Sequence, residues 1–532
     1  MAYNLIEEAW IPVLRKDGQS DIVAPWQLTD DNPPIRVAAC RADFNGALTE
    51  FLIGLVQTCM PPQTEREWRK LRDSPPSPDI LYKFFSAESD AFLLDGHGPR
   101  FMQDLTLTSE KTGKLTSITS LLIDSPGDNT VKRNTDFFVK RGRIERLCPA
   151  CAAGALYTMQ SFAPSGGSGN RTSLRGGGPL TTIILGNTLW ETIWSNMLTY
   201  DTLKSFGGKA SMPREGGIFP WLAPTHTSEK GEKTHLSEVH PLHVYWGMPR
   251  RIRLVFEESA PSECSLCNLK HNLFTSSYLA RPRGYDYTGS WVHPLSPIRD
   301  TDNGYLAVKG SFDGLGYQNW LGLVYRELKQ KNSVQAAPVV YNYRNHRVFT
   351  GDTNRSDFRI WAFGYDMDNM KPRGWCEGIM PAWAVPDKQI AQKLTQEISR
   401  LILCAVQSRD ILQWALQEAF FSDYLKANKQ SSYMESVSER FWSATRSSFF
   451  SFLVIMLDAV MRSDDPQIDL RLQWLSYLNK TGKDIYTYLT NSESLITIDP
   501  KGYARGWSIL TTNLSPYNKK MNKILDLALK ID

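Results

Sequence analysis

Long apolar runs are missing from this chain, and none approaches the roughly eighteen residues that a membrane-spanning helix needs. The opening MAYNLIEEAW also lacks the basic segment and apolar core of a secretory signal. Cysteine is scarce, with 8 in 532 residues, so a secreted fold built on disulfides is not expected. We therefore expect a soluble cytoplasmic protein with no membrane partner.

A strong net charge is absent as well. Lysine and arginine number 60 against 56 aspartates and glutamates, so any affinity for a charged partner must come from local patches. Apolar residues make up 42% of the chain, which contains 16 tryptophans. This composition and length predict a folded protein with two or three domains.

The common catalytic motifs are missing too. The glycine-rich stretch APSGGSGN (163–170) lacks the lysine of the phosphate-binding GxxxxGK[ST] loop. Its GGSGN ends in asparagine, where a GxSxG hydrolase elbow has glycine. The zinc-protease motif HExxH does not occur, and seven of the 8 histidines show no ligand spacing. His271, four residues after Cys267, is an alternative metal ligand. The residues alone make no strong case for an enzyme.

Positive charge is concentrated in one window between Lys132 and Arg146. Six basic residues against two acidic ones give it a net charge of +4, as much as the whole chain carries. The six are Lys132, Arg133, Lys140, Arg141, Arg143 and Arg146. A CxxC pair and the glycine-rich stretch follow directly. This window suits a polyanion-binding site, and it equally suits a solvated loop beside a metal site.

Four cysteines form two CxxC pairs, each able to place two thiolates on one ion from a tight turn. They are Cys148, Cys151, Cys264 and Cys267. Together they predict a closed tetrahedral zinc site with a structural role, because no coordination position stays open for catalysis. Buried or redox-active thiols are the alternative. The remaining cysteines, Cys40, Cys59, Cys376 and Cys404, are predicted to lie in the core.

A glycine loop beside basic and aromatic residues can bring bare main chain close to a nucleic-acid duplex, at the shallow minor groove. In that interpretation Phe137 and Phe138 would stack on bases. Arg171 and Arg175 would contact phosphates.

The apolar pattern predicts an α+β protein. Residues 1–380 are expected to form a mixed α/β N-terminal domain that includes the zinc-knuckle region. Alternation predicts strands at 250–258, 337–343 and 358–365. Apolar residues at three- and four-residue steps then predict an all-α C-terminal domain, a four-helix bundle over 386–532. Its later helices are expected at about 435–462, 466–490 and 504–530.

Several short motifs occur in a fixed order along the chain. They are NLIEEAWIPV, FMQ, CPAC, the glycine loop, SLRGGGPLTT, CSLC, WVHPLSP and FGYDMDNMKPRGW. This ordered set resembles the large subunit of the type I-E CRISPR Cascade complex, the CasA family, over essentially the whole chain. The resemblance implies a protein that is not an enzyme. The implied partners are other Cascade subunits with bound CRISPR RNA, double-stranded target DNA, and a helicase-nuclease effector.

The resemblance also assigns roles to two loops. A loop that contacts guide RNA and DNA corresponds to Phe137, Phe138, Val139, Lys140 and Arg141, where the family tip commonly reads Phe-Val-Asn. The glycine loop lies along the minor groove of the protospacer-adjacent motif, the short DNA element beside the guide-paired target. Its residues here are Gly166, Gly167, Ser168 and Gly169, with Ser168 in place of a glycine found in a relative.

Two further contacts with DNA are implied. A hairpin tip that wedges under the motif and splits the first base pair corresponds to Asp368, Asn369 and Met370. Asn369 stands where a relative has glutamine. A lysine of that relative contacts the motif from the segment after the second CxxC, and either Arg281 or Arg283 takes its place here.

Two other functions stay open on the residues alone. A zinc-dependent nucleic-acid-processing enzyme, such as a nuclease or a deaminase, would need an open metal site. A purely structural scaffold, in which zinc holds two lobes together, would need no contact with DNA.

Overall fold

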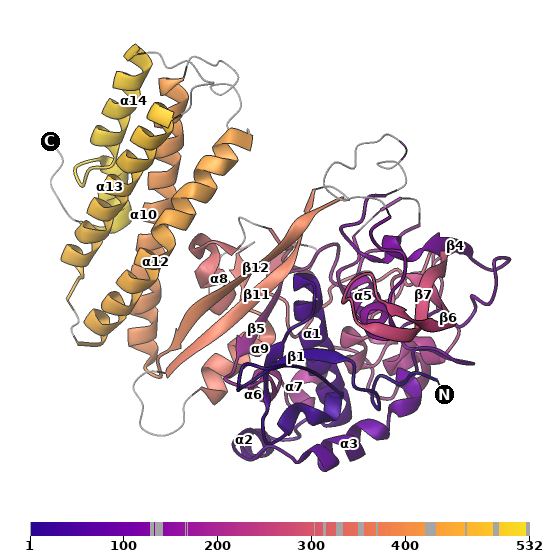
Figure 1. The fold of residues 1–532 in the computed structure, drawn as a ribbon. Coiled ribbons are helices and arrows are strands. Elements are labelled where there is room, and N and C mark those ends of the chain that lie inside the picture. Colours follow the sequence, from indigo (N-terminus) through magenta and orange to yellow (C-terminus); the bar gives the residue numbers. More distant parts are fainter. Residues whose placement is uncertain are drawn as a thin grey trace. The chain divides into compact units, whose positions relative to one another are not determined.

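The computed structural model describes residues 2–527 with gaps at 128–131, 133–141, 165, 168, 303, 312–314, 326–332, 349–355, 369–370, 421–431, 463–464 and 493–499. The described residues form a mixed α+β fold with a helical C-terminal region, as the sequence predicts (Figure 1). They divide into two compact units. The second comprises Trp383–Asp532 with the earlier stretches Asp313–Leu321 and Phe349–Asp357. The predicted domain limits, 1–380 and 386–532, stay a prediction.

The start of the chain forms a small antiparallel sheet in the first unit. Its strands are β1 (Ile11–Arg15), β2 (Ser20–Val23) and β3 (Pro34–Val37), in the order β2-β1-β3. Gly18 lies in the turn between β1 and β2 with a φ of +86°, a conformation that glycine adopts without steric cost.

Two helices, α1 (Ala42–Cys59) and α5 (Pro149–Phe162), pack against each other in this unit. Phe51 of α1 is fully buried in a cluster of aromatic rings. The rings that meet it edge-on are Trp10, Phe92, Phe101, Tyr157 and Trp246. Buried aromatic side chains dominate the energetics of a core, so this cluster gives α5 a fixed position.

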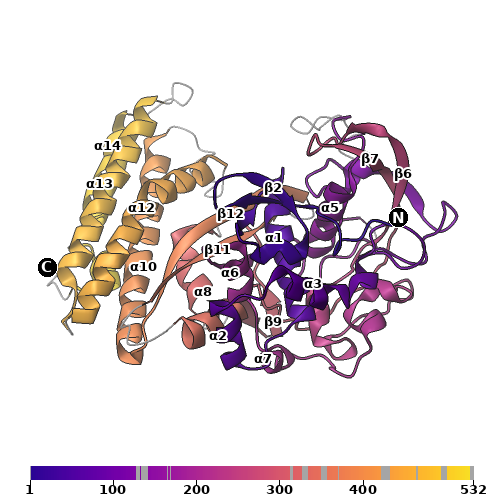
Figure 2. The ribbon, with the colours of Figure 1, turned by 60° about the horizontal axis from the view of Figure 1, so that its bottom comes forward.

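Three more sheets complete the first unit. One has the order β4-β7-β6, from β4 (Lys114–Ser117), β6 (Arg251–Glu263) and β7 (Lys270–Arg281), with α5 beside β7 in both views (Figures 1 and 2). A second has the order β12-β11-β5, from β5 (Thr181–Leu185), β11 (Ser356–Asp368) and β12 (Lys371–Ala384). The first two residues of β11 and the last two of β12 belong to the second unit. The third comprises β8 (Ile298–Thr301), β9 (Gly304–Ala307) and β10 (Val334–Gln335).

Shorter helices connect these strands. They are α2 (Glu65–Asp73), α3 (Pro78–Ser86), α6 (Leu189–Ser195), α7 (Tyr200–Lys204), α8 (Trp320–Val324) and α9 (Pro338–Asn342). The strand predicted at 337–343 is therefore wrong. Pro338 occupies the first turn of α9, where its missing N–H costs nothing, and apolar residues alone do not distinguish a short strand from a buried helical turn. The strands predicted at 250–258 and 358–365 lie within β6 and β11.

Long helices dominate the second unit. They are α10 (Lys388–Ala419), α12 (Ser432–Arg462), α13 (Ile468–Ser492) and α14 (Pro500–Asn513), followed by the short α15 (Lys519–Leu525). Helix α10 packs against α12, α13 and α14, which gives the predicted bundle (Figure 1). The single segment predicted at 504–530 is wrong, because it is divided between α14 and α15. Pro516 lacks an N–H to continue a helix, and Asn518 caps α15 by accepting the N–H groups of Lys520 and Met521.

Among the described residues, helix α12 has the length and the apolar composition that a membrane-spanning helix needs. One such helix is weak support for a membrane span. Its buried side chains, among them Phe449, Leu453 and Met456, belong to a helix that packs against α10 and α13. A role as a bundle helix accounts for this apolar character.

Candidate nucleic-acid interface and metal centre

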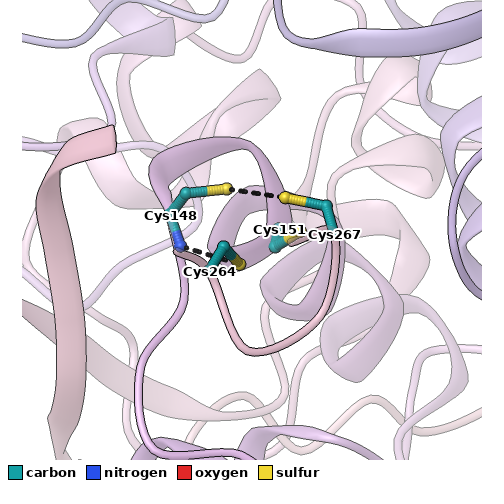
Figure 3. Close-up of side chains that lie close together, drawn as sticks. All are labelled: Cys148, Cys151, Cys264 and Cys267. Atoms are coloured by element: carbon teal, nitrogen blue, oxygen red, sulfur yellow. Dashed lines mark hydrogen bonds between the residues drawn. The ribbon is translucent and has the colours of Figure 1, made fainter. Parts of the chain in front are cut away.

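Four thiols far apart in the sequence meet in one cluster (Figure 3). They belong to Cys148, Cys151, Cys264 and Cys267, and their Sγ atoms all lie within 4.8 Å of one another. The Sγ atoms of Cys148 and Cys267 are 3.8 Å apart. Sulfur atoms bound at about 2.3 Å to one tetrahedral zinc would also lie about 3.8 Å apart. The structure thus brings together the two pairs that the sequence assigns to a single ion.

Two elements of different kinds hold this cluster. Cys148 is the N-cap residue of α5 and Cys151 lies in its first turn, so two of the sulfurs sit at a helix N-terminus. Cys264 and Cys267 lie in the turn between β6 and β7, which is closed by a 3.0 Å hydrogen bond from the Asn268 N–H to the Cys264 carbonyl. The main-chain N–H of Cys148 donates to the Sγ of Cys264 over 3.4 Å.

Two of the four thiols, those of Cys264 and Cys267, favour the ionised form, whereas hydrogen bonds within the cluster and burial raise the pKa values of Cys148 and Cys151. Hydrogen bonds from Cys148 and Cys151 lower the pKa of Cys267 to about 7 and lower the pKa of Cys264 further. The positive end of α5 also favours negative charge at its N-terminus. Thiolate is the form that binds zinc, and several thiolates in one largely buried cluster repel one another unless a cation neutralises them. The donor set therefore fits a structural metal.

Of the remaining cysteines, Cys40 departs from its prediction. It is exposed, and its thiol forms a hydrogen bond with Cys151, so its assignment to the core is wrong. Cys40 precedes α1, beside the cluster, and a scattered cysteine gives no sequence signal for such a neighbour. Cys376 and Cys404 are buried as predicted, and Cys59 is half-buried.

The glycine loop follows α5 and has one closed and one open end. At the closed end, a Cβ on Gly169 would lie 2.9 Å from Cγ of Arg283, and the φ of Gly169 is +82°. The N–H of Arg283 also donates to the Gly169 carbonyl over 2.7 Å. At the open end, a Cβ on Gly166 would meet nothing within 4 Å, and Gly167 is exposed with a φ of +68°. The chain's own packing thus requires glycine at 169 and not at 166.

Arg281 and Arg283 lie beside this loop and are both exposed. Arg281 ends β7 and pairs with Glu229 over 2.9 Å. Arg283 has a φ of +68°, which is unusual for a residue with a side chain, and its guanidinium donates to the Glu229 carbonyl over 2.8 Å. The structure therefore brings both alternative cations to the glycine loop.

The two arginines of the glycine segment have different surroundings. Arg171 is about one-third exposed and pairs with Asp286 over 3.0 Å. Arg175 is buried, with 2% of its side chain exposed, and pairs with the equally buried Glu50 over 2.6 Å. A phosphate contact by Arg175 is therefore wrong, because its guanidinium is committed to the core. Its hydrogen bond to Thr181 ties this segment to β5.

Two paired strands, β11 and β12, lie on either side of the predicted wedge in the chain. β11 ends at Asp368 and β12 begins at Lys371, so two residues connect the paired strands. Asp368 is exposed. Gly178 packs below this end of the hairpin, since a Cβ there would lie 2.6 Å from Cγ of Met367. The segment 163–178 therefore runs from α5, past Arg283, to the strand that ends at Asp368.

Several predicted residues lie outside the described part of the chain. They are Phe137, Phe138, Val139, Lys140 and Arg141 of the contact loop, Ser168 of the glycine loop, and Asn369 and Met370 of the wedge. Their assignments stay predictions.

Three residues that position this interface were not predicted from the sequence. Glu229 accepts from Arg251 as well as from Arg281, and the Arg250 guanidinium donates to the carbonyl of Pro164 at the start of the glycine loop. Glu229 falls in a stretch without periodicity, and its partners lie more than twenty residues away. No sequence signal marks it.

The fold is that of solved Cse1 and CasA proteins. Cse1 from Thermobifida fusca matches with a TM-score of 0.70 at 15% identity, over 99% of each chain. CasA from Thermus thermophilus matches with a TM-score of 0.69 at 16% identity, over 97% of this chain and 99% of that one. A chain from a CRISPR RNA-guided surveillance complex matches with a TM-score of 0.64 at 15% identity, over 96% and 99%. At identities this low, the structural matches establish a shared fold and no more than that.

The sequence itself matches a family model, described as CRISPR-associated protein Cse1, over residues 4–485. That range includes both CxxC pairs, the glycine loop and the paired strands β11 and β12. It covers most of the chain, including nearly all of the first compact unit and the second unit as far as residue 485. The chain belongs to the Cse1 family of CRISPR-associated proteins.

Proposed function

We propose that this chain is the large, non-catalytic subunit of a CRISPR RNA-guided surveillance complex. In this role it recognises the protospacer-adjacent motif in double-stranded DNA, promotes strand separation and R-loop formation, and helps to recruit the helicase-nuclease. Base pairing with the guide reads the long target sequence, so the protein needs to read only a short duplex element.

One observation carries this proposal: open glycine main chain lies next to exposed cations. Gly166 carries no side chain although no neighbour within 4 Å requires its absence, and Arg281 and Arg283 flank the same loop. A surface of this kind lets a duplex approach the main chain while guanidinium groups neutralise its phosphates. The minor groove, which is shallow and narrow, is the surface that such a loop fits.

The remaining roles rest on the family. Asn369, with Asp368 and Met370, would open the first base pair beside the motif. Phe137 to Arg141 would contact the guide RNA and the DNA, and the helical bundle would offer a surface to other subunits of the complex.

The cysteine cluster is proposed to hold a structural zinc and to take no part in catalysis. Four thiolates would fill a tetrahedral coordination sphere and leave no position for a substrate or for water. None of the eight cysteines forms a disulfide in the structure, and the reducing cytoplasm that the sequence predicts would keep the four cluster thiols available to bind zinc.

The test is gel-shift binding by the complex, reconstituted with guide RNA, across duplexes that differ only in the motif, at several salt concentrations. We expect motif-dependent binding that weakens in Gly166→Ala and Asn369→Ala. Gly127→Ala is the matched control, because a Cβ there also meets nothing within 4 Å and Gly127 lies outside the loop. Equal binding to scrambled motifs would overturn the proposal, as would chelator-sensitive cleavage or deamination of nucleic acid by the isolated chain.

A further inference from the structure

One residue, Glu229, contacts three arginines near the glycine loop, two through its carboxylate and one through its main-chain carbonyl. Its Oε1 accepts from Arg251 over 2.8 Å and from Arg281 over 2.9 Å. Its main-chain carbonyl accepts from the guanidinium of Arg283 over 2.8 Å. Glu229 is itself about one-third exposed, with 37% of its side chain accessible. A single turn thus organises the cations nearest the loop.

The contact with Arg251 anchors this arrangement. Arg251 is 4% exposed and also pairs with Asp104, whose side chain is fully buried. Arg251 donates to the Thr106 hydroxyl as well. A guanidinium held on three sides is a fixed donor, so the Glu229 carboxylate stays in place when solvent or a ligand approaches Arg281.

Arg281 and Arg283 consequently differ in how much of their positive charge is available to a negatively charged ligand. Arg251 is balanced by Asp104, so the Glu229 carboxylate is left to balance Arg281. The described contact of the Arg283 guanidinium is with a neutral carbonyl, which orients the group without cancelling its charge. Arg283 also lies directly against Gly169.

We propose that Glu229 is a positioning residue for DNA recognition, which withholds the charge of Arg281 from the duplex and fixes Arg283 as the cation of the glycine loop. This inference rests on the proposed function. Uncompensated cations bind any duplex through its phosphates, whatever the sequence. A carboxylate that cancels one of two neighbouring cations therefore lowers binding to DNA without the motif and preserves discrimination.

The experiment measures binding of the reconstituted complex to duplexes with and without the motif, between 50 and 200 mM salt. Glu229→Gln frees Arg281, and one added phosphate contact raises the salt slope by about 0.9. We expect binding to DNA without the motif to strengthen by roughly 3–5-fold at 50 mM salt, with a smaller gain on the motif duplex. Arg281→Gln alone leaves the Glu229 carboxylate uncompensated and should not strengthen binding to either duplex, and Arg281→Gln added to Glu229→Gln should abolish the gain.

Glu258→Gln is the matched control, because it removes the same charge from an exposed position of β6 away from the loop. A general electrostatic effect would make it behave like Glu229→Gln and would overturn the inference, as would a gain that survives loss of Arg281. Wild-type binding that ignores the motif would instead overturn the proposed function. Thermal melting of each variant identifies any change that comes from misfolding.

Discussion

Two arginine–glutamate pairs flank the same glycine-rich region, and they differ mainly in burial. Arg175 and Glu50 are each 2% exposed and lie 2.6 Å apart. Arg281 and Glu229 are 45% and 37% exposed and lie 2.9 Å apart. The two distances are nearly equal, but the free-energy cost of losing one partner differs between the pairs. A buried charge left without its partner costs several kcal/mol, whereas an exposed pair contributes about 0–1 kcal/mol.

The comparison teaches which end of the region is structural. The Arg175 end joins α1, α5 and β5 through Glu50, the Ser161 carbonyl and Thr181. The Arg281 end leaves its charges within reach of solvent and of a ligand. Substitutions at the first end should therefore change stability, and substitutions at the second should change binding.

The largest effect on stability is expected when the cysteine cluster is disrupted, because it holds the elements from which both ends of the region start. The cysteine cluster ties α5 to the β6–β7 turn, and Cys264→Ser removes one buried ligand. Bound zinc should fall from about one ion per chain to nearly none, with a large loss of stability, because a structural zinc contributes directly to folding. Elemental analysis and thermal melting measure both changes. Cys59→Ser, outside the cluster, should keep its metal, and full occupancy in Cys264→Ser would contradict the site.

Arg175→Ala should cost about 3–5 kcal/mol of unfolding free energy, because Glu50 would remain buried and unpaired. Burial raises the pKa of Glu50, so this carboxyl takes up a proton more readily in the folded protein than in the unfolded chain. Its contribution to stability is therefore greatest at low pH and is lost as the pH rises through the folded pKa. Without Arg175 the deficit should be smaller at pH 5 than at pH 8, as measured by denaturant unfolding. Arg171→Ala serves as the exposed control, and an equal loss there would break the comparison.

Substitutions at two glycines test the same contrast between a structural end and an open end without altering charge. Gly178→Ala should cost about 2–4 kcal/mol, since its φ is +60° and the new Cβ would lie 2.6 Å from the Tyr365 carbonyl. Gly166→Ala should leave the melting temperature nearly unchanged, because nothing surrounds it. Differential scanning calorimetry distinguishes the two. A destabilised Gly166→Ala would mean that the open end is structural as well.

The smallest effect is expected for Arg281→Ala, which should change the unfolding free energy by less than about 1 kcal/mol. Both partners are partly exposed, and Glu229 keeps its bond to Arg251. Chemical denaturation beside Arg175→Ala makes the comparison direct. A loss near that of Arg175→Ala would show that exposure does not separate the two pairs.

The sequence was sufficient for features that local pattern determines. CxxC spacing identified all four clustered thiols, and helical periodicity located the bundle. Local pattern cannot reveal burial, so Arg171 and Arg175 looked alike four residues apart although only Arg175 enters the core. It also could not find Glu229, whose partner Arg281 lies on a strand more than fifty residues later. Long-range ion pairs depend on the fold and leave no trace in spacing.

The backbone of Arg283 has a consequence for engineering this protein. A φ of +68° is a conformation in which glycine is more stable than arginine by about 1 kcal/mol or more. Selection for thermal stability alone should therefore favour Arg283→Gly, and the product would fold better while losing the guanidinium beside Gly169. Under the proposed function, arginine at this position would trade stability against DNA binding. Stabilised variants should be screened for DNA binding before position 283 is allowed to change.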